Sequence, residues 1–186
     1  ADMKVDDAWN ITTGSSGIWV AIIDDGVQLN HPDLAANIVG GYDATGNGSN
    51  GAPTQSNDAH GTNCAGIVAA VANNNIGVSG VAYSCKLVAV RIAYSGTNGD
   101  WVWQDSWAAN GINWAWQNGL ADVLSNSWGG GSSSSAINTA INNAVTQGRS
   151  GKGCPVLFAT GNDNESSIGY PSTNSNVIAV GATSFC

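Results

Sequence analysis

Two residues in the N-terminal third of the chain have side chains suited to proton transfer. Asp24 directly follows the apolar run 18–23, and His60 opens a His-Gly-Thr sequence. A carboxylate that fixes the orientation of an imidazole lets the ring take a proton from a hydroxyl near neutral pH. The pair therefore predicts a site in which Asp24 orients His60, while His60 acts first as base and then as acid. Taken alone, each residue also fits a structural role, at a strand-ending turn or at a helix start.

The elements that must position this pair follow from the apolar pattern. Short β-branched runs alternate with longer segments of helical spacing, which is typical of parallel strands joined by crossover helices. The expected strands are residues 18–23, 87–92, 123–127, 156–160 and 177–180. Each is nearly continuously apolar, so each is expected to be buried on both faces. The expected helices are residues 61–72, 106–117 and 135–147, the last ending at Gly148. The pattern predicts an α/β fold, a three-layer sandwich with a mostly parallel central sheet and functional groups at the carboxyl ends of its strands.

Length and composition narrow the range of functions. A chain of 186 residues fits one domain spanning residues 1–186, with the Gly- and Ser-rich stretches 41–55 and 129–135 as loops inside it. The net charge is -8 with only five Lys and Arg residues, so a nucleic-acid partner is not expected. No apolar stretch approaches the roughly 20 residues that span a membrane. A membrane partner is therefore not expected either.

The four cysteines allow several interpretations. Cys64, Cys85, Cys154 and Cys186 permit three pairings if all are oxidised, and the sequence does not choose among them. Cys64 lies among small apolar residues, where a buried free thiol is expected. An even number of cysteines is typical of an oxidising compartment.

Three segments near the candidate pair carry a family resemblance. Residues 23–26, 31–34 and 60–66 resemble, in this order, consecutive motifs of the subtilisin-like serine proteases. Asp25 makes the first motif Asp-Asp-Gly, which is closest to the kexin and furin branch. The resemblance implies a subtilisin-like fold and serine endopeptidase activity through an Asp/His/Ser triad. Asp25 itself is expected to be either an exposed turn carboxylate or a contact to substrate.

Later motifs extend the resemblance to the rest of the site. Residues 159–162 are similar to the family's oxyanion turn, which implies that Asn162 donates to the oxyanion; a plain Gly-Asn turn is the alternative. The resemblance also implies two walls of a substrate pocket, formed by Ser127, Trp128 and Gly129 on one side and by Gly169 and Tyr170 on the other. Ser132 and Ile168 stand where furin-like enzymes have carboxylates, so an apolar or uncharged substrate side chain is expected.

A structural calcium ion is the cofactor that the resemblance implies. Residues 71–78 are similar to the family's calcium loop, and Asp33 matches its remote carboxylate. The implied ligands are Asp33, the Asn74 side chain and the main-chain carbonyls of Val71, Ile76 and Val78. An asparagine-rich turn without an ion is the alternative.

Five tryptophans gather between residues 101 and 116. Trp107 and Trp114 lie seven apart on an expected helix, so core packing is predicted for them. Trp101 and Trp103 are expected in the preceding loop, where the family builds its outer substrate subsites. Core packing and a carbohydrate-binding surface are the other interpretations of that pair.

The family's catalytic serine lies in a Gly-Thr-Ser motif, and this sequence contains none. Ser184 is expected in a loop after the last strand, so the serine region is predicted to be absent from the C-terminal side and the chain to be inactive alone. The expected partners are a peptide or protein substrate, a second copy at the truncated edge, or the missing C-terminal part. A non-catalytic peptide-binding domain is the alternative function. The expected location is extracellular, by secretion, or at the cell surface.

Overall fold

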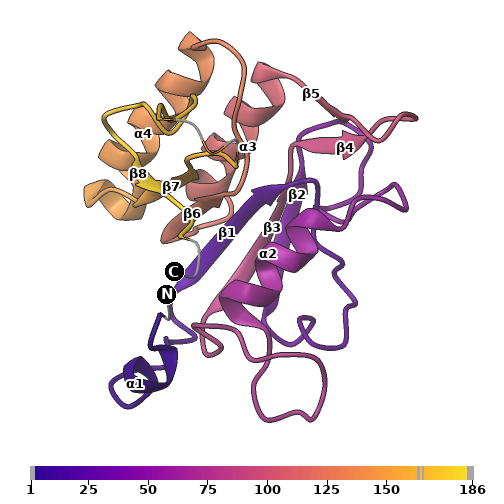
Figure 1. Cartoon of the computed structure of the whole chain (residues 1–186), viewed down its shortest axis with the longest axis vertical. Helices are drawn as coiled ribbons and strands as arrows, with labels where there is room; N and C mark the ends of the chain where they lie inside the picture. Colours follow the sequence, from indigo (N-terminus) through magenta and orange to yellow (C-terminus); the bar gives the residue numbers. More distant parts are fainter. Residues whose placement is uncertain (1–2, 163, 165, 184–186) are drawn as a thin grey trace.

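The computed structural model describes residues 3–162, 164 and 166–183 (Figure 1). Its centre is a six-stranded sheet in the order β2-β3-β1-β6-β7-β8, and all neighbouring strands pair in parallel. The strands are β1 (Trp19–Asp24), β2 (Ile38–Asp43), β3 (Lys86–Arg91), β6 (Val123–Asn126), β7 (Val156–Ala159) and β8 (Ile178–Val180). Five of the six match the expected strands to within one residue at each end. The predicted parallel sheet is confirmed.

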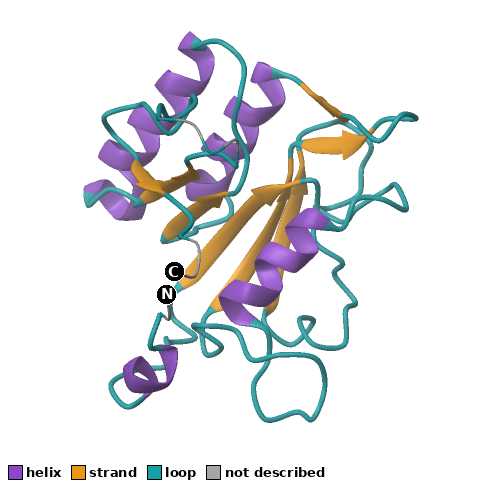
Figure 2. Cartoon of the chain, in the orientation of Figure 1, coloured by secondary structure: helices purple, strands orange, loops and turns teal. Residues whose placement is uncertain are grey.

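Helices cover both faces of this sheet. The described helices are α1 (Val5–Trp9), α2 (His60–Ala69), α3 (Asp105–Gln117) and α4 (Ser135–Gly151). Figure 2 shows α2 on one side of the sheet and α3 with α4 on the other. The three-layer sandwich is therefore confirmed. The regular part of α4 ends where expected, because Gly148 has an extended ψ of 159°.

The residues of β1 alternate between two hydrophobic clusters. Val20 and Ile22 pack in the cluster on the α2 side, whereas Ala21 and Ile23 pack in the cluster on the side of α3 and α4. A strand buried on both faces must be apolar at nearly every position, which explains the continuous run in the sequence. Asp24 is the first carboxylate after that run, so the packing of β1 fixes where its side chain lies.

The chain changes direction across the sheet at β1. After β1 it builds β2 and β3 on one side, and then crosses to β6, β7 and β8 on the other. Ligand sites in open α/β sheets form outside the carboxyl ends of the strands at such a switch point. The carboxyl end of β1 is therefore where a site is expected on topology alone.

Three expectations about local structure were wrong in part. Residues 41–43 were expected in a loop but belong to β2, which pairs with β3. Trp101 and Trp103 lie in the short strand β5 (Trp101–Trp103), which forms an antiparallel hairpin with β4 (Ala93–Ser95). The last strand, β8, was expected to be buried on both faces, but it lies at the edge of the described sheet with Ile178 54% exposed.

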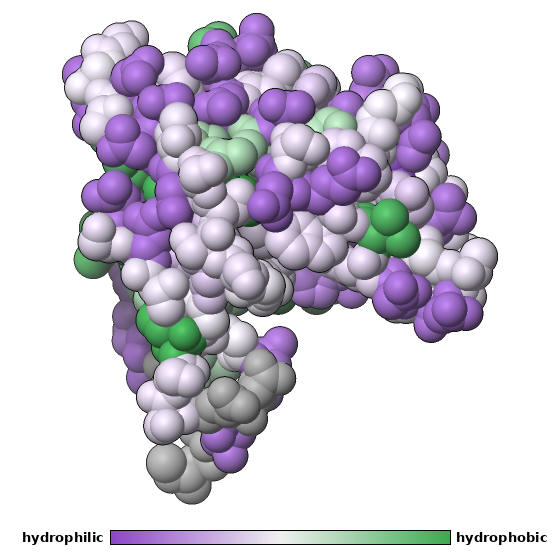
Figure 3. All heavy atoms as spheres, turned by 90° about the horizontal axis from the view of Figure 1, so that it is seen from above, coloured by the Kyte–Doolittle hydropathy of each residue, from purple (hydrophilic) through white to green (hydrophobic). Residues whose placement is uncertain are grey.

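The described cysteines carry free thiols. Cys85 and Cys154 are buried. Cys64 was expected to be buried too, but it is only half-buried. Cys186 and Ser184 lie outside the described residues. Among the helices that the structure describes, none has both the length and the apolar composition needed to cross a membrane. The face seen in Figure 3 carries hydrophobic side chains only in small, separate spots.

Candidate active site

The fold brings Asp24 and His60 into direct contact. Asp24 ends β1, His60 opens α2, and Nδ1 of His60 lies 2.8 Å from Oδ1 of Asp24. The Asp24 side chain is fully buried and the imidazole is 48% exposed. Because a carboxylate is the acceptor, Nδ1 is the donor and Nε2 is left for proton exchange with another group. The pair has the geometry that base catalysis requires.

The environment of His60 favours the charged ring. The hydrogen bond to Asp24 raises the pKa of His60 from 6.5 to about 10, with a smaller contribution from the Cys64 thiol, although partial burial acts in the opposite direction. The Sγ atom of Cys64 lies 3.9 Å from Nδ1. The same hydrogen bond stabilises the imidazolium that forms once the ring has taken a proton.

Asp25 was expected to be an exposed carboxylate or a substrate contact, and the first of these interpretations is wrong. The side chain is buried, with 1% of the residue exposed. Its oxygens accept hydrogen bonds from the main-chain N–H groups of His60, at 3.2 Å, and Gly61, at 2.7 Å. Burial is the main cause that raises the pKa of Asp25 to about 6.

A surface hollow of ≈ 330 Å³ opens beside His60. It is lined by His60, Ile92, Ala93, Trp101, Trp103, Ser127, Trp128 and Gly129. The ring of Trp101 meets the imidazole edge to face, with 5.7 Å between ring centres. Large aromatic rings next to a polar catalytic group are typical of a site that holds an apolar side chain. The first predicted pocket wall therefore lies at the hollow.

The second predicted wall packs directly against the first. Gly130 donates from its N–H to the carbonyl of Tyr170 over 2.7 Å, and Gly169 precedes that residue in the same turn. A side chain at Gly129 would place Cβ 3.1 Å from the same carbonyl, so this close approach favours glycine. The Tyr170 hydroxyl donates to the carbonyl of Ser134 at 3.1 Å. The structure thus brings both predicted segments together.

Asn162 is not part of this described contact set. It follows β7 and the positive-φ residue Gly161, its side chain is exposed, and it is not among the residues that line the hollow. A donor to an oxyanion must lie where the reacting carbonyl oxygen will be. Its role as the oxyanion donor stays a prediction.

The expected calcium loop lies against the expected remote carboxylate. Asp33 is buried and accepts hydrogen bonds from the Asn74 amide at 2.7 Å and from the Val78 N–H at 2.9 Å. Val71 donates to the main-chain carbonyl of Asp33, and Ile76 donates to the Asn74 side chain. Residues 73–79 line a hollow of ≈ 260 Å³. A carboxylate with amide and carbonyl oxygens is the set of ligands that calcium prefers, and the structure brings Asp33 and Asn74 together at this loop.

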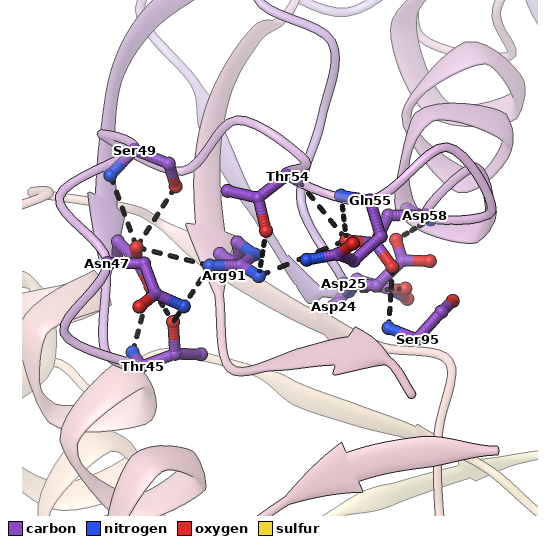
Figure 4. A network of polar contacts seen from close by, with 12 residues as sticks. Asp24, Asp25, Thr45, Asn47, Ser49, Thr54, Gln55, Asp58, Arg91 and Ser95 are labelled. Atoms are coloured by element: carbon purple, nitrogen blue, oxygen red, sulfur yellow. Dashed lines mark hydrogen bonds and ion pairs between the residues drawn. The ribbon is translucent and has the colours of Figure 1, made fainter. Parts of the chain in front are cut away.

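Sequence reasoning missed a buried arginine next to the pair. Arg91 ends β3 and is fully buried (Figure 4). Its two terminal guanidinium nitrogens lie 3.2 Å from Oδ2 of Asp43 and 3.9 Å from Oδ2 of Asp58. Hydroxyl groups of Thr45 and Thr54 accept further hydrogen bonds from its guanidinium, at 2.8 and 2.6 Å. The only signal in the sequence is a charged residue inside an apolar run, where a buried ion pair is the one arrangement that tolerates it.

Of the two tryptophans predicted to pack in the core, Trp114 packs against the main hydrophobic cluster, whereas Trp107 is not among the described residues that do so. Trp114 stacks on Tyr42 with 5.0 Å between ring centres and 10° between ring planes. Trp107 packs against Tyr94 of the β4–β5 hairpin, with 6.0 Å between centres. Trp103 differs from both, because it lines the hollow. Its ring centre lies 6.2 Å from that of Trp128.

Known proteins resemble the chain over nearly its whole length. It matches the subtilase family over residues 15–185. It is 43% identical to thermitase of Thermoactinomyces vulgaris over 176 residues, which cover 95% of this chain and 58% of thermitase. It is 41% identical to subtilisin E of Bacillus subtilis (strain 168) over 174 residues, which cover 91% of this chain and 42% of that protein.

A third relative is a calcium-dependent protease of Trichormus variabilis, 38% identical over 203 residues that cover 98% of this chain and 28% of the relative. The chain thus spans between 28% and 58% of the length of these three relatives. The family match, the order of the motifs and the contact between Asp24 and His60 agree. The chain belongs to the subtilase family.

Proposed function

We propose that this chain is part of a serine endopeptidase domain, in which Asp24 and His60 activate a serine from outside these 186 residues. The observation that carries the proposal is the 2.8 Å contact between Nδ1 of His60 and Oδ1 of Asp24 at the edge of the hollow. Asp24 fixes the ring so that Nε2 takes the proton of the attacking hydroxyl and later gives it to the leaving amine. Membership of the subtilase family supports the same reaction.

The negative charge that develops on the substrate carbonyl needs a donor. In this proposal, the donor is the side-chain amide of Asn162, which stands at the turn after β7. A preorganised amide stabilises the tetrahedral intermediate more than the substrate, and so accelerates the chemical step. Its exposed position leaves the amide free to meet a bound peptide.

The substrate is a peptide or protein bound in extended form across Ser127, Trp128 and Gly129. None of the residues that line the hollow is a carboxylate, so an apolar or uncharged side chain is the expected occupant. Placement in the kexin and furin branch rests on Asp25 and stays a prediction, because the relatives named above are thermitase and a subtilisin. A preference for arginine before the cleaved bond would support that branch; a preference for leucine or phenylalanine supports the aromatic hollow.

A calcium ion held by the loop 71–78 and Asp33 is the second part of the proposal. The ligands are Asp33, the Asn74 side chain and the carbonyls of Val71, Ile76 and Val78, and the ion would tie the loop to the turn that follows β1. One relative is a calcium-dependent protease, which supports an ion in the family. The expected result is a lower unfolding temperature after chelation of calcium. A single partial domain that acts outside the cell or at its surface completes this proposal.

Binding without hydrolysis is the second candidate function. The aromatic hollow beside His60 supports it, since Trp101, Trp103 and Trp128 offer contact area whether or not a nucleophile is present. The exposed edge strand β8 is also a place where a second copy or a further segment of a protease domain could pair. Sedimentation at two concentrations separates a monomer from a self-associating chain.

The test compares the chain alone with a chimera that joins residues 1–183 to the thermitase segment following the matched region. Both are incubated with a peptide library and a serine-directed fluorophosphonate, and each is repeated with His60→Ala. We expect turnover and labelling in the chimera only, both lost with His60→Ala. Peptide binding by both proteins without any turnover would favour the binding function. Turnover by the chain alone would contradict a nucleophile from outside.

A further inference from the structure

We propose that Asp25 is a positioning residue for His60, whose carboxylate holds the first turn of α2 so that the imidazole stays against Asp24. The inference rests on the proposed function, because it gives Asp25 a part in the same site. Neither interpretation of Asp25 from the sequence includes this role.

Both carboxylate oxygens of Asp25 accept hydrogen bonds from the first two residues of α2. One carboxylate oxygen, Oδ2, accepts from the N–H of His60 at 3.2 Å, and the other, Oδ1, accepts from the N–H of Gly61 at 2.7 Å. The residue before the helix, Ala59, provides no side-chain cap. A carboxylate at this end of a helix satisfies unpaired N–H groups and interacts favourably with the helix dipole. Asp25 therefore caps α2 from another element.

The main chain of Asp25 also contacts the partner of His60. The N–H of Asp25 donates to Oδ1 of Asp24 at 2.8 Å, and that oxygen is also the acceptor for Nδ1 of His60. Asp24 thus holds the side chain of His60, and Asp25, the next residue in the chain, holds its main-chain N–H. Loss of the Asp25 contact would free the helix start to rotate while leaving Asp24 in place.

Helix α2 approaches the end of β1 so closely that there is no room for a side chain at Gly61. A Cβ at Gly61 would meet the Gly26 carbonyl, would lie 2.8 Å from Cβ of Asp24, and would lie 3.0 Å from Oδ1 of Asp25. Such contacts leave the two elements little freedom to slide past each other. The carboxylate of Asp25 lies within this close contact and accepts the Gly61 N–H there.

Several charges surround Asp25. Asp24 precedes Asp25 in the chain and raises its pKa, and the N–H of His60 contacts it from α2. Asp58, two residues before His60, and Arg91, the register partner of Asp24 on β3, carry the charges of the adjoining network (Figure 4). Burial raises the pKa of Asp25 to about 6, so the cap should weaken as the pH falls through this value. A pH titration can therefore follow the cap directly.

The experiment uses nuclear magnetic resonance on the 186-residue chain, and needs no turnover. It follows the main-chain amides of His60 and Gly61, their hydrogen exchange, and the ring signals of His60 and His31, the two histidines of the chain. In the wild type we expect both amides to shift together with a midpoint near pH 6. In Asp25→Asn we expect that transition to vanish, Gly61 to exchange about tenfold faster, and His60 to titrate at lower pH.

The matched control is Asp122→Asn. Asp122 also accepts a hydrogen bond from a main-chain N–H, that of Trp19 at 3.0 Å, but it does so at the opposite end of β1 from Asp25. It should leave both amides and the His60 titration as in the wild type. Equal His60 titration curves in the two variants would overturn the proposal, as would amides that do not respond near pH 6 in the wild type. If Asp25→Asn does not fold, the wild-type titration alone decides. A thermitase chimera without peptidase activity would refute the proposed function and leave this test unaffected.

Discussion

Trp128 donates a hydrogen bond from its indole Nε1 to the main-chain carbonyl of Ile23, 2.9 Å away and one residue before Asp24. Its ring also meets Phe158 of β7 edge to face, with 4.9 Å between ring centres. The wall of the hollow and the carboxylate that orients His60 are therefore anchored to the same end of β1. A disturbance at Trp128 should reach both.

Replacing Trp128 by phenylalanine is expected to lower the free energy of unfolding by about 1–3 kcal/mol beyond the loss of ring area, because the buried carbonyl of Ile23 loses this donor. Urea unfolding measures the change. Trp116→Phe is the matched control, since its Nε1 is buried and has no hydrogen-bond partner among the described residues. Equal destabilisation by the two substitutions would mean that the bond to Ile23 contributes nothing.

Replacing Arg91 by methionine is expected to destabilise the fold by about 3–5 kcal/mol, because it leaves the carboxylates of Asp43 and Asp58 buried without their cation. The measurement is the urea midpoint at constant slope. Arg149→Met serves as control: Arg149 pairs with Asp122 at 3.3 Å, but both side chains are partly exposed, so a change of about 0–1 kcal/mol is expected. A small effect at Arg91 would contradict a structural role for the network.

Replacing Gly61 by alanine is expected to destabilise the chain and to separate His60 from Asp24, because the new Cβ would collide with the end of β1. Gly66 lies in the same helix. A Cβ added there would meet no atom of another described segment within 4 Å, so Gly66→Ala should stabilise the fold by about 0.4–1 kcal/mol. The thermal unfolding temperatures of both variants show whether Gly61→Ala lowers the stability and Gly66→Ala raises it. Stabilisation by both would show that α2 does not press on β1 as described.

The contact between Asp24 and His60 predicts a pH dependence of stability. The pKa of His60 is raised from 6.5 to about 10, so the folded state binds the proton more tightly than the unfolded chain. The resulting stability is fully present below pH 6.5 and is lost as the pH rises through about 10. Urea unfolding midpoints of the wild type and of His60→Gln, compared between pH 6 and 10, isolate the contribution of His60 to the free energy of unfolding. Parallel curves for the two proteins would contradict the shift.

The sequence predicted the sheet well because its strands are buried on both faces. Residues 18–23 and 87–92 are apolar runs that only a central parallel strand explains, and they form β1 and β3. Strand β2 was missed because its residues 40–41 are glycines, which weaken a strand signal, and because it lies at a sheet edge. The predicted burial of Ile178 was wrong for a similar reason, because the strand order, and not the local sequence, decides which strand lies at the edge of the sheet.

Within the site, contacts made by main-chain groups were the hardest to predict. Asp24 and His60 were found because a side chain meets a side chain and both types have a chemical signature. The burial of Asp25 was missed because its partners are N–H groups, which every residue except proline has. The network of Arg91 was missed for another reason: its partners Asp43 and Asp58 lie far away in sequence, and nothing local marks them as a pair.

The central claim is that Asp24 orients His60 for base catalysis, and Asp24→Asn in the thermitase chimera tests it most directly. An asparagine keeps the shape but favours the wrong tautomer of the ring, so kcat should fall by about 10⁴-fold with little change in KM. Asn162→Ala is the comparison, since loss of an oxyanion donor in a subtilisin costs roughly 10²- to 10³-fold. The account predicts the larger loss at Asp24. Unchanged kcat in Asp24→Asn would contradict it.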